Sequence, residues 1–69
     1  MASYNDVIQG LLFFAKREGV NARGVCAEHD EVWAGAETPP EKLTPSELEV
    51  IKGFGWHYVK DIGGWRRFV

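Results

Sequence analysis

Cysteine is almost absent from this chain of 69 residues, in which Cys26 stands alone. One cysteine cannot close an intramolecular disulfide, and it excludes a zinc site built from several thiolates. Long apolar runs are also missing, because the longest, from Leu11 to Ala15, has five residues and a membrane span needs about 20. No basic, apolar leader is visible either. We therefore expect no membrane association and a reducing, cytoplasmic compartment.

Motifs for catalysis and cofactor binding are lacking as well. The glycines do not form a G-x-x-x-x-G-K-[ST] or G-x-G-x-x-G loop. His29 and Asp30 are the residue types of a metal-dependent phosphohydrolase, but the only other histidine is His57, and such a site needs more ligands. Cys26 lies between apolar neighbours on an expected strand, which favours a buried structural thiol over a nucleophile. We predict no catalytic residue, no metal site and no cofactor.

What the chain does have is a globular composition with many aromatic residues. Hydrophobic residues make up 45% and charged residues 26%, and there are three Trp, two Tyr and four Phe. A chain of this size buries only about 60% of the surface that it exposes when unfolded, so large side chains must supply the core. We expect one domain over residues 1–69.

The spacing of apolar residues predicts a helix over residues 4–18. Its stripe recurs at i, i+3, i+4 and i+7 and consists of Tyr4, Val7, Ile8, Leu11, Phe14 and Ala15. Ser3 is a suitable N-cap and Gly19 a suitable C-terminal stop. Leu12 and Phe13 widen the stripe, so we expect one flank of this helix to be exposed.

A second helix is predicted over residues 45–54 by a full set of terminal signals. Thr44, Pro45 and Glu47 form a capping box with proline at the first helical position. Leu43 and Leu48 can form the hydrophobic staple. At the other end, Gly55 is expected to adopt a positive φ and Trp56 to pack on Ile51, as in a Schellman motif.

Four strands are predicted around these helices. Residues 22–28 and 31–35 flank a turn at His29-Asp30, and residues 56–60 and 65–69 flank a turn that ends in Gly63-Gly64. The order α-β-β-α-β-β predicts an α+β fold: a four-stranded, mainly antiparallel sheet with two helices on one face. The expected core consists of Leu11, Phe14, Val25, Val32, Leu48, Ile51, Trp56 and Trp65.

Charge is unevenly distributed and marks two candidate surfaces. Between residues 28 and 49, seven carboxylates stand against one lysine; the candidate protein-binding residues there are Glu28, Asp30, Glu31, Glu37 and Glu41. The last hairpin is basic and aromatic, and its candidate nucleic-acid-binding residues are His57, Lys60, Arg66 and Arg67. Strand alternation argues against using all four together, because Arg66 and Phe68 share one face while Arg67 lies on the other.

The segment from residue 25 to the end resembles a set of small phage- and prophage-type proteins. The likeness lies in Ala27-Glu28-His29-Asp30-Glu31-Val32-Trp33-Ala34-Gly35, in Leu43-Thr44-Pro45, in Gly55-Trp56-His57, and in Trp65 with Phe68-Val69. Gly63-Gly64 departs from it, since a more acidic turn is expected before Trp65. The resemblance implies a phage or prophage origin and a small α+β domain, and it implies no activity, cofactor or catalytic residue.

Two functions of different classes follow. The first is a non-catalytic phage- or prophage-type protein that binds a host or phage protein through its acidic surface. The alternative is a nucleic-acid-binding accessory protein that uses the final hairpin. A chain-wide pI near 5.6 favours the first, because proteins that bind phosphate backbones usually carry net positive charge. The partner's identity and the oligomeric state stay open.

The C-terminal residues are expected to matter for stability. If Phe68 and Val69 are buried in the last strand, each contributes about 1.5–3 kcal/mol, a large part of the free energy of unfolding in so small a domain. Deleting residues 68–69 is then expected to unfold most of the population, whereas deleting residues 1–2 is not.

The capping box generates a first testable prediction. Thr44→Ala removes the side chain that caps the second helix and should lower the free energy of unfolding by about 1 kcal/mol. Chemical denaturation of the variant and the parent measures the difference. An unchanged midpoint would contradict the predicted helix start.

Overall fold

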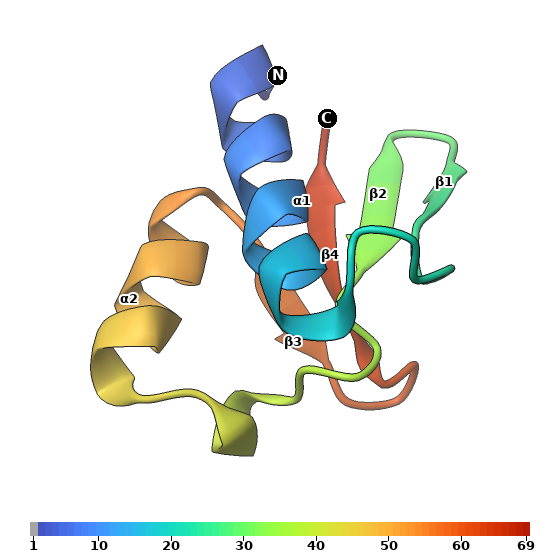
Figure 1. Cartoon of the computed structure of the whole chain (residues 1–69). Coiled ribbons are helices and arrows are strands. Elements are labelled where there is room, and N and C mark those ends of the chain that lie inside the picture. The colour runs from blue at the N-terminus through green and yellow to red at the C-terminus, as the bar shows by residue number, and fades with distance from the viewer. Residues whose placement is uncertain (1) are drawn as a thin grey trace.

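Helices and strands follow one another as the sequence predicts. The computed structural model describes residues 2–69. Its elements are α1 (Tyr4–Glu18), β1 (Cys26–Glu28), β2 (Glu31–Ala34), a 3-10 turn η1 (Pro40–Lys42), α2 (Pro45–Gly53), β3 (His57–Val59) and β4 (Gly64–Phe68). Figure 1 shows this order along the chain. The α+β prediction is confirmed.

The four strands form one sheet in the order β1-β2-β4-β3, and every neighbouring pair is antiparallel. β2 and β4 are therefore central, while β1 and β3 are edges. In the register, Ala34 lies opposite Trp65, and Trp65 lies opposite Tyr58, so these three share one side of the sheet. Directly opposed residues always lie on the same face. The register thus assigns each strand residue to one of two faces.

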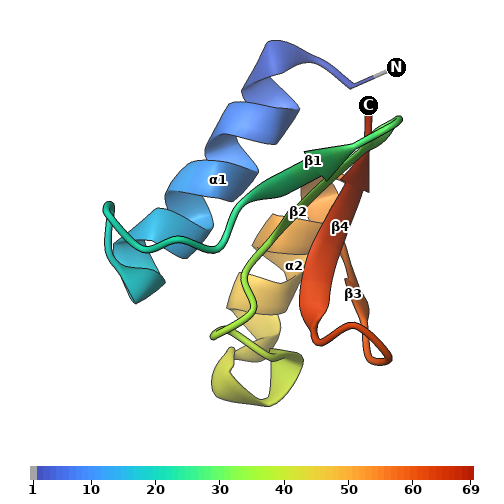
Figure 2. The ribbon, with the colours of Figure 1, turned by 90° about the vertical axis from the view of Figure 1, so that its right-hand side faces the viewer.

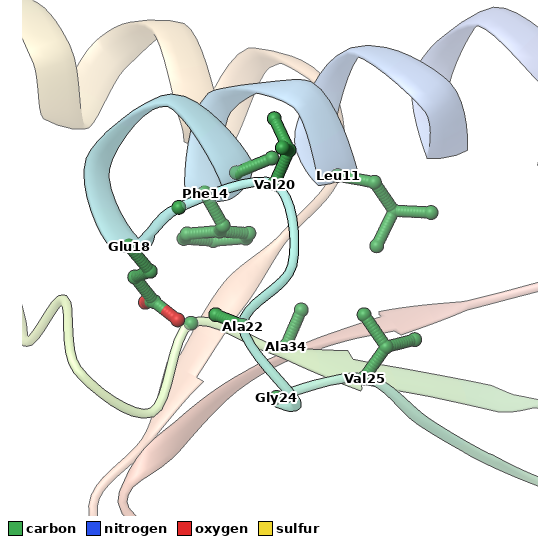
Figure 3. Close-up of a pocket in the computed structure, with 11 residues that line it drawn as sticks. Leu11, Phe14, Glu18, Val20, Ala22, Gly24, Val25 and Ala34 are labelled. Atoms are coloured by element: carbon green, nitrogen blue, oxygen red, sulfur yellow. The ribbon is translucent and has the colours of Figure 1, made fainter.

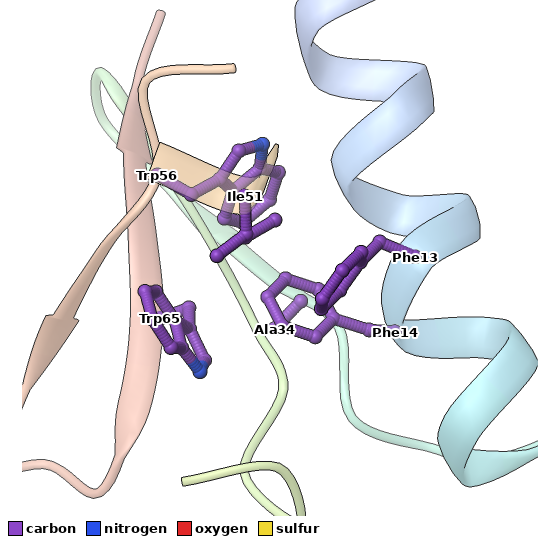
Figure 4. Packing of buried hydrophobic residues seen from close by; sticks show 6 residues of the cluster. All are labelled: Phe13, Phe14, Ala34, Ile51, Trp56 and Trp65. Carbon is purple, nitrogen blue, oxygen red and sulfur yellow. The ribbon is translucent and has the colours of Figure 1, made fainter. Parts of the chain in front are cut away.

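Both helices pack on the face that carries Trp65. Phe13 and Phe14 of α1, Ile51 of α2 and Trp65 of β4 belong to one buried cluster, and Figure 4 shows their side chains pointing toward one another. In Figure 2 the strands β3 and β4 form the border of the molecule away from the helices. One sheet face is thus covered and the other is open. No helix among residues 2–69 is long and apolar enough to cross a membrane.

Two tryptophans hold the layers together. The indole N–H of Trp56 donates to the backbone oxygen of Asp6 in α1 at 3.2 Å, and that of Trp65 donates to the backbone oxygen of Thr38 at 2.7 Å. The ring of Phe14 lies between them, at centroid distances of 5.5 Å from Trp56 and 6.0 Å from Trp65. Because each buried indole finds an acceptor, the two largest side chains enter the core without an unpaired donor.

The predicted helix caps are confirmed, although α2 ends at Gly53, one residue before the predicted end at residue 54. The Asp6 N–H donates to Ser3 Oγ at 3.1 Å, the Glu47 N–H donates to Thr44 Oγ1 at 3.2 Å, and the Thr44 N–H donates to Glu47 Oε1 at 2.8 Å. The hydrogen bond from the Thr44 N–H, and after it the bond from Arg17, lower the pKa of the Glu47 carboxyl. At the end of α2, Gly55 has a φ of +86°, and the Trp56 N–H donates to the Ile51 oxygen at 3.4 Å.

Several core predictions are wrong. Val25 is 62% exposed and the thiol of Cys26 is exposed as well, because β1 is an edge strand and begins only at Cys26. Phe13, expected on an exposed flank, is buried under the guanidinium of Arg17, which lies 3.6 Å from the ring centroid. Of the other predicted core residues, Leu11, Val32 and Leu48 are partly buried against the cluster.

The expected burial of the C-terminus is also wrong. Phe68 is 48% and Val69 43% exposed, because Phe68 points to the open side of the sheet and Val69 follows the last strand residue. The end of the chain is held by backbone pairing instead, with the Val69 N–H donating to the Asp30 oxygen at 2.8 Å. Deletion of residues 68–69 therefore removes two half-exposed side chains instead of buried core residues, and the argument for global unfolding from lost core burial does not hold.

Packing of Trp56 on α1 generates a second prediction. A Cβ on Gly10 would lie 1.9 Å from the Trp56 indole nitrogen, so Gly10→Ala should lower the free energy of unfolding by about 1–3 kcal/mol, as overpacking does. Alanine favours the helix over glycine by about 1 kcal/mol. If the space at Gly10 were free, the substitution would therefore raise the free energy of unfolding instead of lowering it.

The matched control is Gly53→Ala at the end of α2. A Cβ there has no heavy atom within 4 Å, and the substitution should raise stability by up to about 1 kcal/mol. Thermal melting of both variants beside the parent gives the signs. A Gly10→Ala variant as stable as the parent would show that Trp56 does not lie against α1.

Candidate functional site

One face of the sheet has no helix over it among residues 2–69, and we call it the open face. Its side chains follow from the register, since Trp33 lies opposite Arg66, Arg66 lies opposite His57, and Glu31 lies opposite Phe68. Together with the alternating positions along each strand, the open face consists of Cys26, Glu28, Glu31, Trp33, His57, Val59, Arg66 and Phe68.

Arg66 occupies the centre of the open face. Its Nε–H donates to His57 Nε2 at 3.0 Å, and its NH1 donates to Glu31 Oε1 at 3.2 Å. Its guanidinium carbon lies 4.6 Å from the ring centroid of Phe68 and 5.3 Å from that of Trp33. The side chain is only 27% exposed. A single cation thus ties together residues from the three strands β2, β3 and β4.

The neighbours of Arg66 also bind one another. The indole N–H of Trp33 donates to the second carboxylate oxygen of Glu31 at 3.3 Å. The rings of His57 and Phe68 lie 5.7 Å apart at an angle of 32°. Glu31 therefore accepts from two side chains, and the aromatic rings flank the guanidinium. Aromatic rings thus surround the guanidinium of Arg66, whose charge is already paired with Glu31.

Burial is the main reason for a lowered pKa of His57, and the positive charge of Arg66 adds to it. Glu31 acts in the opposite direction, and Arg67 contributes a further, smaller lowering. A neutral imidazole has one nitrogen free to accept a hydrogen bond. The neutral form at neutral pH agrees with the bond from Arg66 to His57 Nε2.

The open face carries no surplus of positive charge. Arg66 is opposed by Glu31 in an ion pair, and Glu28 adds a second carboxylate that is 71% exposed. Lys60 lies in the exposed turn after β3. A strand of phosphates laid across this face would meet carboxylates as well as cations, which weakens binding.

The four residues predicted for nucleic-acid binding do not share a surface. His57 and Arg66 lie together on the open face, and Lys60 lies beside it. Arg67 points to the helix side, where its NH2 lies 3.4 Å from Asp6 Oδ2 and its NH1 donates to the Phe68 oxygen at 2.8 Å. Its side chain is 18% exposed, so it supports the fold instead.

The five acidic candidates are divided as well. Glu28 ends β1, Asp30 lies in the turn between β1 and β2, and Glu31 is held in the cluster around Arg66. Glu37 and Glu41 lie in and after the loop that leaves the other end of β2, and both are exposed. Figure 1 shows the turn and this loop at opposite ends of the sheet. The residues do not form one acidic patch.

Several hollows lie on the helix side of the molecule, and two of them are lined mainly by apolar surface. One has a volume of about 220 Å³ and is formed by α1, the loop after it and the first hairpin; Figure 3 shows Leu11, Phe14, Val25 and Ala34 around it. The other, of about 410 Å³, lies between α1 and α2 over Phe13 and Phe54. Among residues 2–69 no three His, Cys, Asp or Glu side chains come together as metal ligands.

Of the three residues that complete the cluster, only Glu31 is predicted from the sequence as a candidate binding residue, and the sequence does not place Glu31 beside Arg66. Trp33 was expected only as a strand residue, Phe68 as core, and Glu31 as part of an acidic surface. The usable signal is the alternation of Glu31 and Trp33 on one strand and of Arg66 and Phe68 on the other. What the sequence does not contain is the pairing of β2 with β4, which places these residues side by side.

Comparison with known proteins adds no assignment. No family model, no curated protein and no solved structure matches the chain.

Proposed function

We propose that this domain is a non-catalytic protein-binding module and that its open face is the surface that docks a partner protein. The observation that carries the proposal is the cluster of Trp33, Phe68 and Arg66 on a sheet face that no helix of residues 2–69 covers. Phe68 is 48% exposed. A phenylalanine that serves only the fold is usually buried in the core.

Residue type and charge favour a protein as the partner. Tryptophan and arginine are among the residues that contribute most binding energy in protein interfaces, and aromatic residues and arginine are enriched there while lysine is depleted. The charges of Arg66 and Glu31 already satisfy one another. Covering this pair leaves no charge unpaired, which limits the desolvation cost of docking.

The arrangement of His57 supports a role without catalysis. Its Nε2 accepts from Arg66, so that nitrogen is not free to act as a base toward a substrate. Cys26 is on the same face but at the far edge strand, in β1, whereas His57 is in β3. The proposal of a host or phage protein as partner rests on the resemblance of residues 25–69 to phage-type proteins, and that of the cytoplasm on the single cysteine.

Binding of single-stranded nucleic acid is the second candidate, and one observation favours it. The rings of Trp33, His57 and Phe68 line one antiparallel sheet face, and bases can stack on such aromatic surfaces. The carboxylates of Glu28 and Glu31 on the same face argue against it. We therefore place it after protein binding.

The proposal predicts that the open face decides partner capture. The tagged domain is used to capture proteins from a bacterial lysate, and the affinity of each captured protein is then measured with purified components. Phe68→Ser should weaken the interaction by at least about tenfold, the equivalent of ~1.4 kcal/mol, because it removes an exposed aromatic anchor. Circular dichroism checks that the variant is folded.

The control is Tyr4→Ser on α1. Tyr4 is 89% exposed and lies on the helix side, so this variant loses an aromatic group without touching the open face and should bind as the parent does. Equal losses in both variants would contradict docking on the open face. A measured affinity for single-stranded oligonucleotides that falls steeply with salt would instead favour the second candidate.

A further inference from the structure

The bond between Arg66 and His57 depends on the protonation state of the imidazole. Arg66 Nε–H is a donor, and His57 Nε2, at 3.0 Å, is the acceptor. A protonated imidazole carries hydrogen on both nitrogens and has no acceptor left. Protonation therefore breaks this bond and leaves two positive charges at hydrogen-bonding distance.

The groups around His57 act in both directions. Partial burial, which includes packing against Phe68, disfavours its protonated form most. The positive charge of Arg66 acts in the same direction, and so does that of Arg67, which lies on the other face of β4. Glu31 on β2 favours it. The carboxylate of Glu31 already accepts from Arg66 and from Trp33, so a protonated His57 would compete with Arg66 for it.

We propose that His57 gates the open face: neutral His57 holds Arg66 at its centre, and protonation releases Arg66 and disassembles the docking surface. The consequence for binding rests on the proposed function, while the rearrangement itself concerns the free protein. Without its bond to His57, the guanidinium keeps one hydrogen-bonded partner, Glu31, at 3.2 Å. Protonated His57 then competes with Arg66 for that carboxylate. The rings of Trp33 and Phe68 then lose the cation that lies against both.

The direction of the pH dependence follows from linkage. The pKa of His57 is lowered in the folded protein because burial and Arg66 disfavour its charged form. The stability that comes from the neutral cluster is therefore complete above the ordinary histidine value of about 6.5 and is lost as the pH falls through the lowered value. The assembled open face is the form at neutral pH.

An NMR titration of the free protein tests the gate. The His57 ring should titrate with a midpoint below about 6.5. The Arg66 Nε–H signal should change its chemical shift with the same midpoint as its hydrogen bond to His57 Nε2 is lost, while the amide signals of α1 and α2 stay in place. A midpoint at or above 6.5, or an Arg66 signal that does not respond to it, would overturn the gate.

Three variants make the test specific. His57→Gln keeps an acceptor but cannot titrate, so its Arg66 Nε–H signal should keep its chemical shift through the acid range. Arg66→Gln should raise the midpoint of His57, because it removes the nearest positive charge. Lys16→Gln removes an exposed cation on α1, on the other side of the sheet, and should leave that midpoint unchanged. A His57→Gln variant whose Arg66 signal still shifts with the parent's midpoint would also overturn the gate.

Binding is measured separately. For a partner that docks on the open face, affinity should fall at least about fivefold, the lower end of typical coupling, when the pH drops below the His57 midpoint, and His57→Gln should abolish this fall. An equal fall in both proteins would refute control of binding by His57. If the NMR titration behaves as expected but no protein docks, the proposed function fails and the gate stands.

Discussion

The contact between Trp56 and the bare backbone of α1 at Gly10 is the constraint on which the rest of the structure depends. Trp56 directly precedes β3 and follows the Gly55 stop of α2, so it is the point where the second helix turns into the sheet. Its indole binds the Asp6 oxygen, which links that point to the first turns of α1. One side chain thus positions both helices against the strands.

The helix arrangement determines which parts of the sheet are covered. α1 and α2 meet over the two central strands through Phe14, Ile51 and Trp65, and a hollow of about 220 Å³ remains between α1 and the first hairpin. Val25 lines that hollow and stays exposed, whereas Cys26 is exposed because it lies opposite Trp33 on the open face. Because both helices lie on one side of the sheet, the opposite face has no packing partner among residues 2–69, and its aromatic side chains remain accessible.

Local signals were readable from the sequence and long-range pairings were not. The capping box at Thr44, the Ser3 cap and the positive φ of Gly55 each depend on neighbours within a few residues, and all three are present. The exposure of Val25 depends on where α1 lies. The cluster around Arg66 depends on β2 pairing with β4, which is separated from it by a loop, a helix and another strand. Apolar character alone does not tell the buried Phe13 from the half-exposed Phe68.

The neighbouring arginines of β4 show how one strand serves both the fold and the open face. Arg67 points toward the helices, where it lies beside Asp6 and where a Cβ on Gly55 would meet its guanidinium at 2.6 Å. Arg66 points the other way and is held by His57 and Glu31. Substitution of Arg67 is expected to disturb the junction of α1 and α2. Substitution of Arg66 changes the open face, which does not contribute to the core. The two roles differ only by the alternation of the strand, so basic composition alone could not separate the structural cation from the one that organises the open face.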